Sequence, residues 1–381
     1  MSFFLLFAFL HPLPDISAKS AILMDYSTGR VLWAKNEKEE LPPASLTKML
    51  TAILVLEKGN LDDVVEVGGD ISRVEPTCLG LKKGEKITVR DLLTALLVRS
   101  ANDAALALAE YLAGSEGKFV AMMNEKAKEI GALNSNFVNC HGLHHPLHYS
   151  TAYDLALIAR YALSNPIFAS LVSLKRAEIK VWNNEKERKV VLESTNKLLS
   201  LYPYANGIKT GYTREAGRCL AASARKDGWQ LIAVVLNSND VWKDAQLLFE
   251  YGFNLFRHSF VARKGIPIGY LKTSGKPERI ALLPKDDLVV FSPLGELPRI
   301  EVEKKIFKEE PPIRAGERLG VMRVKVNGAP WGEVDILAGS DATIGFPRKL
   351  SIFSLKAFLF TFFILFILKF WGERIGRNSF K

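Results

Sequence analysis

The sequence predicts an α/β domain, built from an antiparallel sheet and a large cluster of helices, followed by a small all-β domain. Two observations support this prediction. Between residues 19 and 254, short strand-like stretches alternate with segments whose apolar residues recur at the spacing of a helix. From residue 255 to 346 only short strand-like runs occur, and proline-containing breaks such as Pro311-Pro312 separate them.

The first domain begins and ends with predicted hairpins. The first contains a turn-forming segment that ends in Thr28-Gly29, and the last contains Asp227-Gly228, a pair typical of two-residue hairpin turns. The strands expected to pair are 21–25 with 30–34, and 218–225 with 229–236.

Four helices are predicted between these hairpins. The first begins at Ser45, because apolar residues follow Leu46 at the three-, four- and seven-residue spacing of one helix face. The second has a capping-box-like start at Thr88 and Asp91. The predicted helices run from 45 to 59, from 92 to 98, from about 102 to 114, and from 151 to Asn165-Pro166.

The second domain carries a further hairpin signal. Val321 to Val326 and Trp331 to Ile336 flank Asn327-Gly328. No catalytic constellation occurs in this region. We therefore expect a spacer or a docking surface.

Composition excludes several classes of protein. An apolar content of 48% argues against disorder and against a protein with many membrane spans. The net charge of +10 is compatible with nucleic acid, an anionic surface or an acidic substrate, but no zinc-finger spacing or RNA-binding signature occurs, so nucleic acid is not an expected partner. The three cysteines, Cys78, Cys140 and Cys219, are scattered, and we expect them to be small buried thiols.

Both ends of the chain indicate export and membrane attachment. Residues 1–18 contain an apolar run and small residues before Ala18, as in a signal peptide, although no basic residue precedes the run; a misplaced start or a simple apolar tail is the alternative. Residues 350–371 predict a membrane anchor helix, since about 20 apolar residues span a bilayer. Residues 372–381 form a basic tail that is expected in the cytoplasm. A helix that lies flat in the interface is the alternative to a spanning anchor.

The first candidate catalytic motif is Ser45-Leu46-Thr47-Lys48. Residues three apart share one face of a helix, so Lys48 can reach the Ser45 hydroxyl and, if desolvated, accept its proton. The helix N-terminus also offers N–H groups to a developing oxyanion. The same spacing occurs elsewhere without a long apolar helix behind it, at Ser115/Lys118, Ser194/Lys197 and Ser223/Lys226.

Two further motifs follow. Ser100-Ala101-Asn102 stands at a break between predicted helices. Asn102 can cap a helix there. In addition, the serine can relay a proton and the amide can hold a substrate amide.

Lys209-Thr210-Gly211 precedes the last hairpin of the first domain. Its cation and hydroxyl suit a carboxylate, and Gly211 allows another chain segment to come close. Each motif is a weak signal alone, and Ser194-Thr195-Asn196 also matches the second.

The order and spacing of the three motifs resemble those of the penicillin-binding protein and serine β-lactamase superfamily. The flanking segments narrow the resemblance to the low-molecular-weight D-alanyl-D-alanine carboxypeptidases, over the whole chain. These segments are Ala21-Ile22-Leu23-Met24-Asp25, Pro43-Ala44-Ser45, Ser100-Ala101-Asn102-Asp103, His141-Gly142-Leu143 and Asn206-Gly207-Ile208-Lys209-Thr210-Gly211-Tyr212-Thr213. Tyr212 stands where some relatives carry histidine.

The resemblance implies a transpeptidase-like fold and a serine peptidase mechanism. Ser45 would attack the carbonyl between the last two D-alanines of a peptidoglycan stem peptide and form an acyl-enzyme. Lys48 would be the base, its pKa lowered by burial and by the charge of Lys209. Ser100 would pass the proton to the leaving amine, and Asn102 would hold the substrate backbone.

The remaining expected roles concern binding. By the resemblance, the N–H groups of Ser45 and Tyr212 form the oxyanion hole, Lys209 and Thr210 grip the terminal carboxylate, and β-lactam antibiotics acylate Ser45. No metal or cofactor is expected. The clustered histidines are expected to have a loop or scaffold role; they are His141, His144, His145 and His148.

Several alternatives remain open. A D,D-endopeptidase acting on cross-links shares all three motifs. A class A β-lactamase needs a deacylating glutamate between the second and third motifs, where Glu193 is the candidate, although its surroundings do not match. A non-catalytic wall-binding or β-lactam-sensing module is the alternative from another class.

Overall fold

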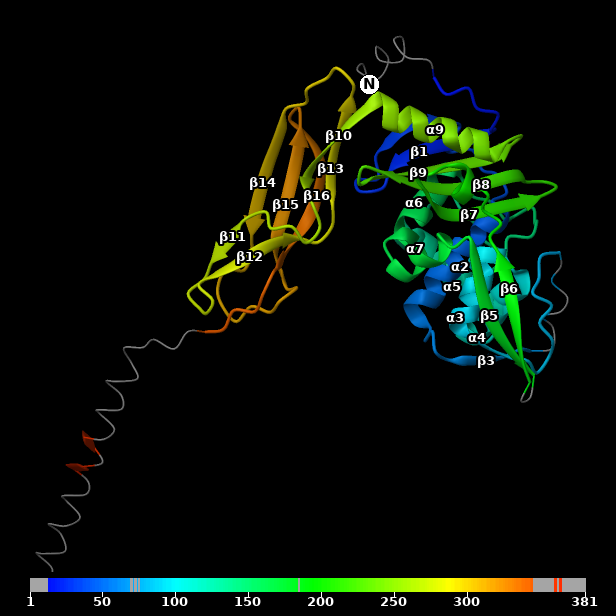
Figure 1. Ribbon diagram of the computed structural model, residues 1–381, viewed down its shortest axis with the longest axis horizontal. Helices are drawn as coiled ribbons and strands as arrows, with labels where there is room; N and C mark the ends of the chain where they lie inside the picture. Colours follow the sequence, from blue (N-terminus) through cyan, green and yellow to red (C-terminus); the bar gives the residue numbers. More distant parts are fainter. Residues whose placement is uncertain are drawn as a thin grey trace, which may run out of the picture. The chain divides into compact units, whose positions relative to one another are not determined.

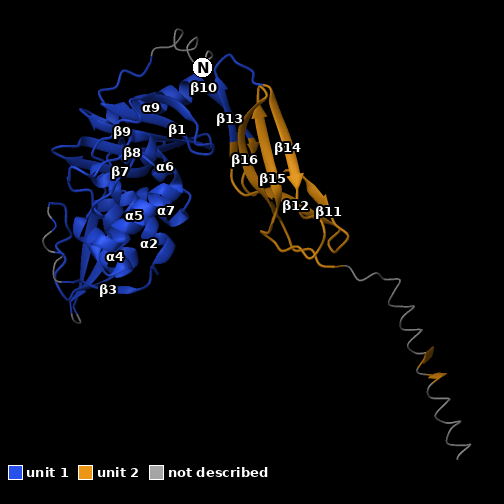
Figure 2. Ribbon diagram, turned by 180° about the vertical axis from the view of Figure 1, so that it is seen from behind, with its two compact units in different colours: residues 1–260, 289–298 blue, residues 261–288, 299–381 orange. Residues whose placement is uncertain are grey.

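The structure is a computed structural model that describes residues 13–68, 71, 74, 76–183, 186–344, 360–361 and 363–364. Most of the predicted signal peptide and anchor helix, and the whole basic tail, lie outside these residues. The chain forms two compact units (Figure 2). The first comprises 1–260 with 289–298, and the second 261–288 with 299–381.

A five-stranded antiparallel sheet forms the centre of the first unit. Both predicted hairpins are confirmed, because residues 21–24 pair with the strand that follows the first turn and residues 218–226 pair with the strand after Asp227-Gly228. The order is β2-β1-β9-β8-β7, with β1 Ser20–Asp25, β2 Val31–Lys35, β7 Ala205–Thr213, β8 Gly217–Lys226 and β9 Trp229–Ser238.

Helices cover both faces of this sheet. Figure 1 shows α9 along one face and α6 with the rest of the cluster on the other. Most helices begin at a side chain that accepts a hydrogen bond from the first turn, such as Thr88, Thr151 and Asp240. The helices are α2 Lys48–Lys58, α3 Val89–Thr94, α4 Asn102–Ala113, α5 Glu116–Ile130, α6 Ala152–Leu163, α7 Pro166–Val172, α8 Leu198–Leu201 and α9 Val241–Leu255.

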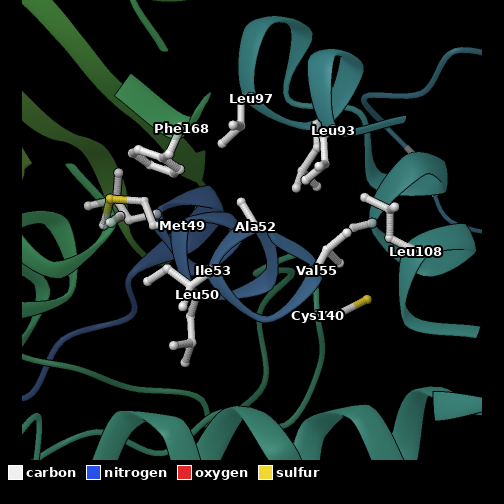
Figure 3. Close-up of a cluster of buried hydrophobic side chains, with 14 of the residues drawn as sticks. Met49, Leu50, Ala52, Ile53, Val55, Leu93, Leu97, Leu108, Cys140 and Phe168 are labelled. Atoms are coloured by element: carbon white, nitrogen blue, oxygen red, sulfur yellow. The ribbon is translucent and has the colours of Figure 1, made fainter. Parts of the chain in front are cut away.

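Helix α2 lies in the middle of the core. Its side chains from Met49 to Val55 are buried on all sides, in contact with Leu93, Leu97 and Phe168 (Figure 3). The helix predicted from Ser45 differs at its start, since Ala44–Thr47 form a 3-10 turn, η1, that leads into α2. The helix predicted over 92–98 likewise changes after α3 into a π-helical turn, η3, at Ala95–Arg99.

A second sheet of four strands, which the sequence did not predict, flanks the helical cluster. Its order is β3-β4-β5-β6, and all its pairs are antiparallel. It brings the end of β6 close to η3 and therefore to Ser100. The strands are β3 Val64–Glu66, β4 Lys86–Thr88, β5 Arg176–Asn183 and β6 Lys186–Glu193.

The described part of the second unit consists largely of strands, as predicted. The hairpin around Asn327-Gly328 is confirmed by the pairing of β15 with β16. The five-stranded order is β11-β12-β16-β15-β14, with β11 Tyr270–Lys272, β12 Arg279–Pro284, β14 Ile300–Ile306, β15 Arg318–Val326 and β16 Ala329–Ala338. Two further strands, β10 Phe256–Ala262 and β13 Leu288–Pro293, pair where the chain passes between the units.

Within the described residues, no single helix is both long and apolar enough to cross a bilayer. The consecutive helices α6 and α7, bent by 110° at their junction, pass the same test only as a pair.

Candidate active site

The Ser45 hydroxyl and the Lys48 amine lie on one turn at the start of α2. Lys48 Nζ is 2.9 Å from Ser45 Oγ and donates to Asn102 Oδ1 at 2.6 Å and to the carbonyl oxygen of His141. The Lys48 side chain is completely buried. Two of its three partners are oxygens that only accept hydrogen bonds, whereas a hydroxyl can also donate. A neutral amine fits this set, because it has two N–H groups for the two acceptors and one lone pair for the Ser45 proton.

Burial lowers the pKa of Lys48 to about 7, as predicted. The repulsion between the two buried lysines is mutual, and the pKa of Lys209 is also lowered well below its ordinary value, first by burial and then by Lys48. Burial among the apolar side chains around α2 is the largest cause of the lowered pKa of Lys48.

Ser100 and Asn102 come from the break between η3 and α4. Ser100 ends η3 in the left-handed conformation, with φ 68° and ψ 30°, and its N–H donates to the Ala95 carbonyl. Asn102 does not cap α4, contrary to expectation, because Ala101 occupies the cap position. The Asn102 amide oxygen instead holds Lys48, and its backbone N–H donates to the Thr77 carbonyl.

The third motif lies on the edge strand β7, beside η1. Lys209 is buried, and its Nζ donates to the Thr210 carbonyl oxygen at 2.9 Å. The Thr210 hydroxyl is 2.7 Å from the hydroxyl of Thr195. A Cβ on Gly211 would lie 3.1 Å from the backbone nitrogen of Ser45, so the predicted close approach is confirmed.

The three motifs converge on one cleft of about 740 Å³. Ser45, Ser100 and Thr210 line it, together with Gly211 and the exposed Tyr212. Lys48, Asn102 and Lys209 are buried and do not contribute to its lining. The other lining residues are Pro76, Thr77, Thr195, Lys197, Arg218, Cys219, Asn239, Asp240, Val241 and Trp242.

Two residues that support the site carried only a weak signal in the sequence. The Asp103 carboxylate accepts hydrogen bonds from the backbone N–H groups of residues 79–81 and so holds the loop beside Asn102. Gly142 has φ +89°, and a Cβ there would lie 1.9 Å from the Ala44 carbonyl oxygen. Both belong to segments that carry the family resemblance, but only the fold shows what they contact.

The histidine cluster lies in a loop, and two of its members support the nucleophile turn. His148 Nδ1 accepts from the Val138 N–H, so its Nε2 donates to Thr47 Oγ1, which in turn donates to the Ala44 carbonyl. Burial lowers the pKa of His148 to about 4 and that of His141 to about 3. Both rings are therefore neutral at physiological pH. In the part of the chain that the structure describes, no group of three or more side chains could hold a metal ion.

The alternative serines have ordinary structural roles. Ser115 caps α5, the Ser194 hydroxyl accepts from the Asn196 N–H, and the Ser223 hydroxyl donates to Asn206 Oδ1. Cys140 and Cys219 are buried thiols, as expected. Cys78 is only half-buried, which corrects the prediction for that residue.

Residues 8–240 match the model of a peptidase family described as D-alanyl-D-alanine carboxypeptidase, S11. The chain belongs to this family of serine hydrolases. The match includes all three motifs and every cleft-lining residue except Val241 and Trp242, and it agrees with the family resemblance of the three motifs.

Individual relatives agree with the family assignment. The chain is 34% identical over 336 residues to the D-alanyl-D-alanine carboxypeptidase DacF of Bacillus subtilis, which covers 85% of each chain. It is 34% identical to DacD of Escherichia coli, over 81% of this chain and 82% of the relative. Among solved structures, penicillin binding protein 5 from Haemophilus influenzae is similar with a TM-score of 0.66 and 27% identity, over 87% of this chain and 99% of that chain. This similarity confirms the predicted fold class.

Proposed function

We infer that the chain is a serine D-Ala-D-Ala carboxypeptidase, which removes the terminal D-alanine from peptidoglycan stem pentapeptides through an acyl-enzyme on Ser45. The single observation that carries this inference is the contact between Ser45 Oγ and a fully buried Lys48 amine whose pKa is about 7. A serine hydroxyl needs such a base to become a nucleophile at neutral pH.

The acylation step follows from this contact. Ser45 Oγ attacks the carbonyl carbon of the penultimate D-alanine while its proton passes to Lys48 Nζ. The negative charge that develops on the carbonyl oxygen is stabilised by the N–H groups of Ser45 and Tyr212, each worth about 3 kcal/mol. When the C–N bond breaks, the amine of the leaving D-alanine takes the proton through the Ser100 hydroxyl. Water then hydrolyses the ester and regenerates Ser45.

Binding roles are assigned from the cleft. Thr210 lines the cleft and Lys209 is buried beside it on β7, and we keep the prediction that the two bind the terminal carboxylate of the substrate. Asn102 positions Lys48 through its amide oxygen, and we keep the prediction that its Nδ2 group contacts the substrate backbone. β-Lactams, whose carbonyl takes the place of the scissile one, acylate the same serine.

Release of D-alanine from a stem pentapeptide tests this function. The Ser45→Ala variant should release none, while the Ser115→Ala variant should keep wild-type activity, because Ser115 has the same spacing to a lysine but only caps α5. Equal release by Ser45→Ala and wild type would exclude Ser45 as the nucleophile.

The β-lactamase alternative lacks support from the cleft, whereas a D,D-endopeptidase would use the same three motifs. Glu193, the candidate deacylating residue of a β-lactamase, is exposed at the end of β6 and pairs with Arg176 at 3.4 Å. It does not line the cleft. We therefore expect slow, near-stoichiometric reaction with nitrocefin. Comparing cross-linked dimers with pentapeptide monomers as substrates separates a D,D-endopeptidase from a carboxypeptidase.

We also propose that the enzyme is exported and held at the outer face of the cytoplasmic membrane by its C-terminus. The apolar run before Ala18, the apolar segment 350–371 and the basic tail 372–381 support this proposal. Membrane fractionation tests it: the full chain should pellet with membranes, and a chain that ends at residue 346 should not. Equal distribution of the two chains would contradict a C-terminal anchor.

A further inference from the structure

The cleft continues beyond the reacting groups to the start of α9. The residues that line this α9 end of the cleft are Asn239, Asp240, Val241 and Trp242. We propose that the α9 end binds the side chain of the leaving residue, and that Asp240 and Trp242 select a side chain that carries an amine at the length of lysine. This inference rests on the proposed carboxypeptidase function and adds a class of leaving residue to D-alanine.

The strand register gives the distance from the oxyanion site to the α9 end. Tyr212 on β7 pairs with Arg218 on β8, which in turn pairs with Ser238 on β9. Neighbouring strands lie about 4.8 Å apart, so Ser238 is about 10 Å from Tyr212 across the sheet. Asp240 comes two residues after Ser238 and is the cap of α9. The cleft therefore extends by about 10 Å from the place where the scissile carbonyl binds.

D-Alanine is too short to fill this length. One residue spans about 3.8 Å along a chain, and a methyl side chain adds a single bond. A lysine side chain in extended form reaches about 6 Å further from its Cα. A leaving residue of that kind brings its terminal amine to the start of α9. The chemistry is unchanged, because Ser45 forms the same ester while the C–N bond to the longer residue breaks and its nitrogen takes the proton.

The α9 end offers a carboxylate oxygen and an indole that have no other partners. Asp240 is exposed, and its Oδ1 accepts the N–H groups of residues 242 and 243, each at 3.1 Å. In the described part of the chain, no cation forms an ion pair with Asp240, and its Oδ2 accepts no hydrogen bond. The indole of Trp242 is partly buried and makes no ring contact or side-chain hydrogen bond with another described residue. An ammonium group is stabilised by a carboxylate and by the face of an indole.

The charges along the cleft place the preference for a cation at the α9 end. Arg218 and Lys197 line the cleft, and Asp240 is the single carboxylate among the described residues that line it. Neither cation lies within ion-pair distance of Asp240. The positive end of α9, equivalent to about half a charge, is smaller than the full negative charge of Asp240. An anionic side chain would be repelled there, whereas an amine is attracted.

Three N-acylated tripeptides test the proposal, ending in D-Ala-D-Ala, D-Ala-D-Lys and D-Ala-D-norleucine. D-Norleucine has nearly the length of D-lysine but no charge. Wild type should hydrolyse the D-Lys peptide with a kcat/KM about 3- to 10-fold above that of the D-norleucine peptide. Asp240→Asn should remove this preference, because asparagine still caps α9 but carries no charge. Trp242→Ala should lower kcat/KM for both long leaving residues by about 10-fold relative to D-alanine, through lost apolar contact.

Glu215→Gln is the matched control. Glu215 is an exposed carboxylate in the turn between β7 and β8, outside the cleft lining, so its loss should leave the preference unchanged. Titration with a fluorescent penicillin counts the folded, active enzyme in each variant. Equal rates for the D-Lys and D-norleucine peptides in wild type, an unchanged preference in Asp240→Asn, or an equal loss in Glu215→Gln would overturn the proposal. Failure of the proposed function is distinct, since wild type would then show no Ser45-dependent release of D-alanine.

Discussion

At the scale of single residues, Lys48 decides the chemistry of the cleft. Its amine is completely buried among apolar side chains of α2 and the neighbouring helices, yet all three of its hydrogen-bonding directions are satisfied. Burial without partners would be costly, and partners of negative charge would keep the amine protonated. With two neutral acceptors and one hydroxyl as partners, the buried neutral amine of Lys48 is stabilised and can still accept a proton.

We predict that acylation by penicillin depends on one group with a pKa near 7. The active form of Lys48 is neutral, so the rate should fall about tenfold per pH unit below 7 and level off above it. The pKa values of His141 and His148 are lowered to about 3 and about 4, so neither ring titrates in this range. Stopped-flow measurement of acylation from pH 5 to 9 checks the profile, and a rate independent of pH would contradict it.

We predict that Asn102→Asp moves this profile to higher pH. A carboxylate in place of an amide oxygen 2.6 Å from Lys48 favours the charged amine and raises its pKa by roughly one to three units. Acylation at pH 7 should fall at least about tenfold and recover at higher pH. Asn102→Ala serves as the control: it removes the same contact without adding charge, so a slow rate in that variant should not recover with pH. An unshifted profile in Asn102→Asp would show that Lys48 is not the titrating base.

At the scale of elements, the sequence predicts most reliably those helices and hairpins whose signals lie within one short segment. The hairpins and the helix after Ser45 were found because their turns and apolar spacing are local signals. Local patterns do not predict the four-stranded sheet, since β3 and β4 are three residues each and β4 pairs with β5, where Lys86 lies opposite Trp182, 96 residues (182 − 86) further along the chain. Helix α5 was also missed, although Ser115 and the buried Phe119, Met123 and Ala127 give it a cap and an apolar face.

The candidate site divides in the same way. The motifs predict its side chains but not its backbone partners. Every residue type has a carbonyl oxygen, so the sequence does not mark those of His141 and Ala44 as contacts of the site. Asn102 was expected to serve the substrate and a helix cap, and only the structure shows that its oxygen is committed to Lys48.

We predict that Gly142→Ala slows acylation about 100-fold, whereas Gly84→Ala leaves the rate near that of wild type. Both glycines have positive φ, so each substitution costs about 1–2 kcal/mol of backbone strain. The new Cβ at position 142 would also lie 1.9 Å from the Ala44 carbonyl and displace the turn that carries Ser45, whereas nothing lies within 4 Å at position 84. A displacement of about 1 Å costs about 100-fold in rate. Acylation rates near wild type in Gly142→Ala would contradict this account of the turn.

At the scale of the whole molecule, the chain leaves the first unit, enters the second and then contributes a further segment to the first. After leaving the first unit at Phe260, the chain comes back at 289–298, where β13 pairs with β10. Such a return depends on pairing between segments distant in sequence, which local patterns do not reveal. Within the first unit, Phe291 of β13 stacks on Trp229 of β9, with ring centroids 5.9 Å apart.

We predict that Phe291→Ala lowers the free energy of unfolding by about 3–5 kcal/mol, since it opens a cavity beside Trp229. Acylation by penicillin at low temperature should remain normal, because the side chain does not line the cleft. Phe307→Ala, at an exposed ring beside Arg318, should cost less than about 1 kcal/mol. Denaturant unfolding of both variants makes the comparison, and similar values for the two would show that the return of β13 contributes little.

The most direct test of the central claim is to map the residue that penicillin modifies. The enzyme is labelled with a fluorescent penicillin, digested, and the labelled peptide is identified by mass. We expect one adduct, on the Ser45 hydroxyl, and its loss in a Lys48→Met variant that still folds. An adduct on any other residue, or undiminished labelling without Lys48, would contradict the mechanism.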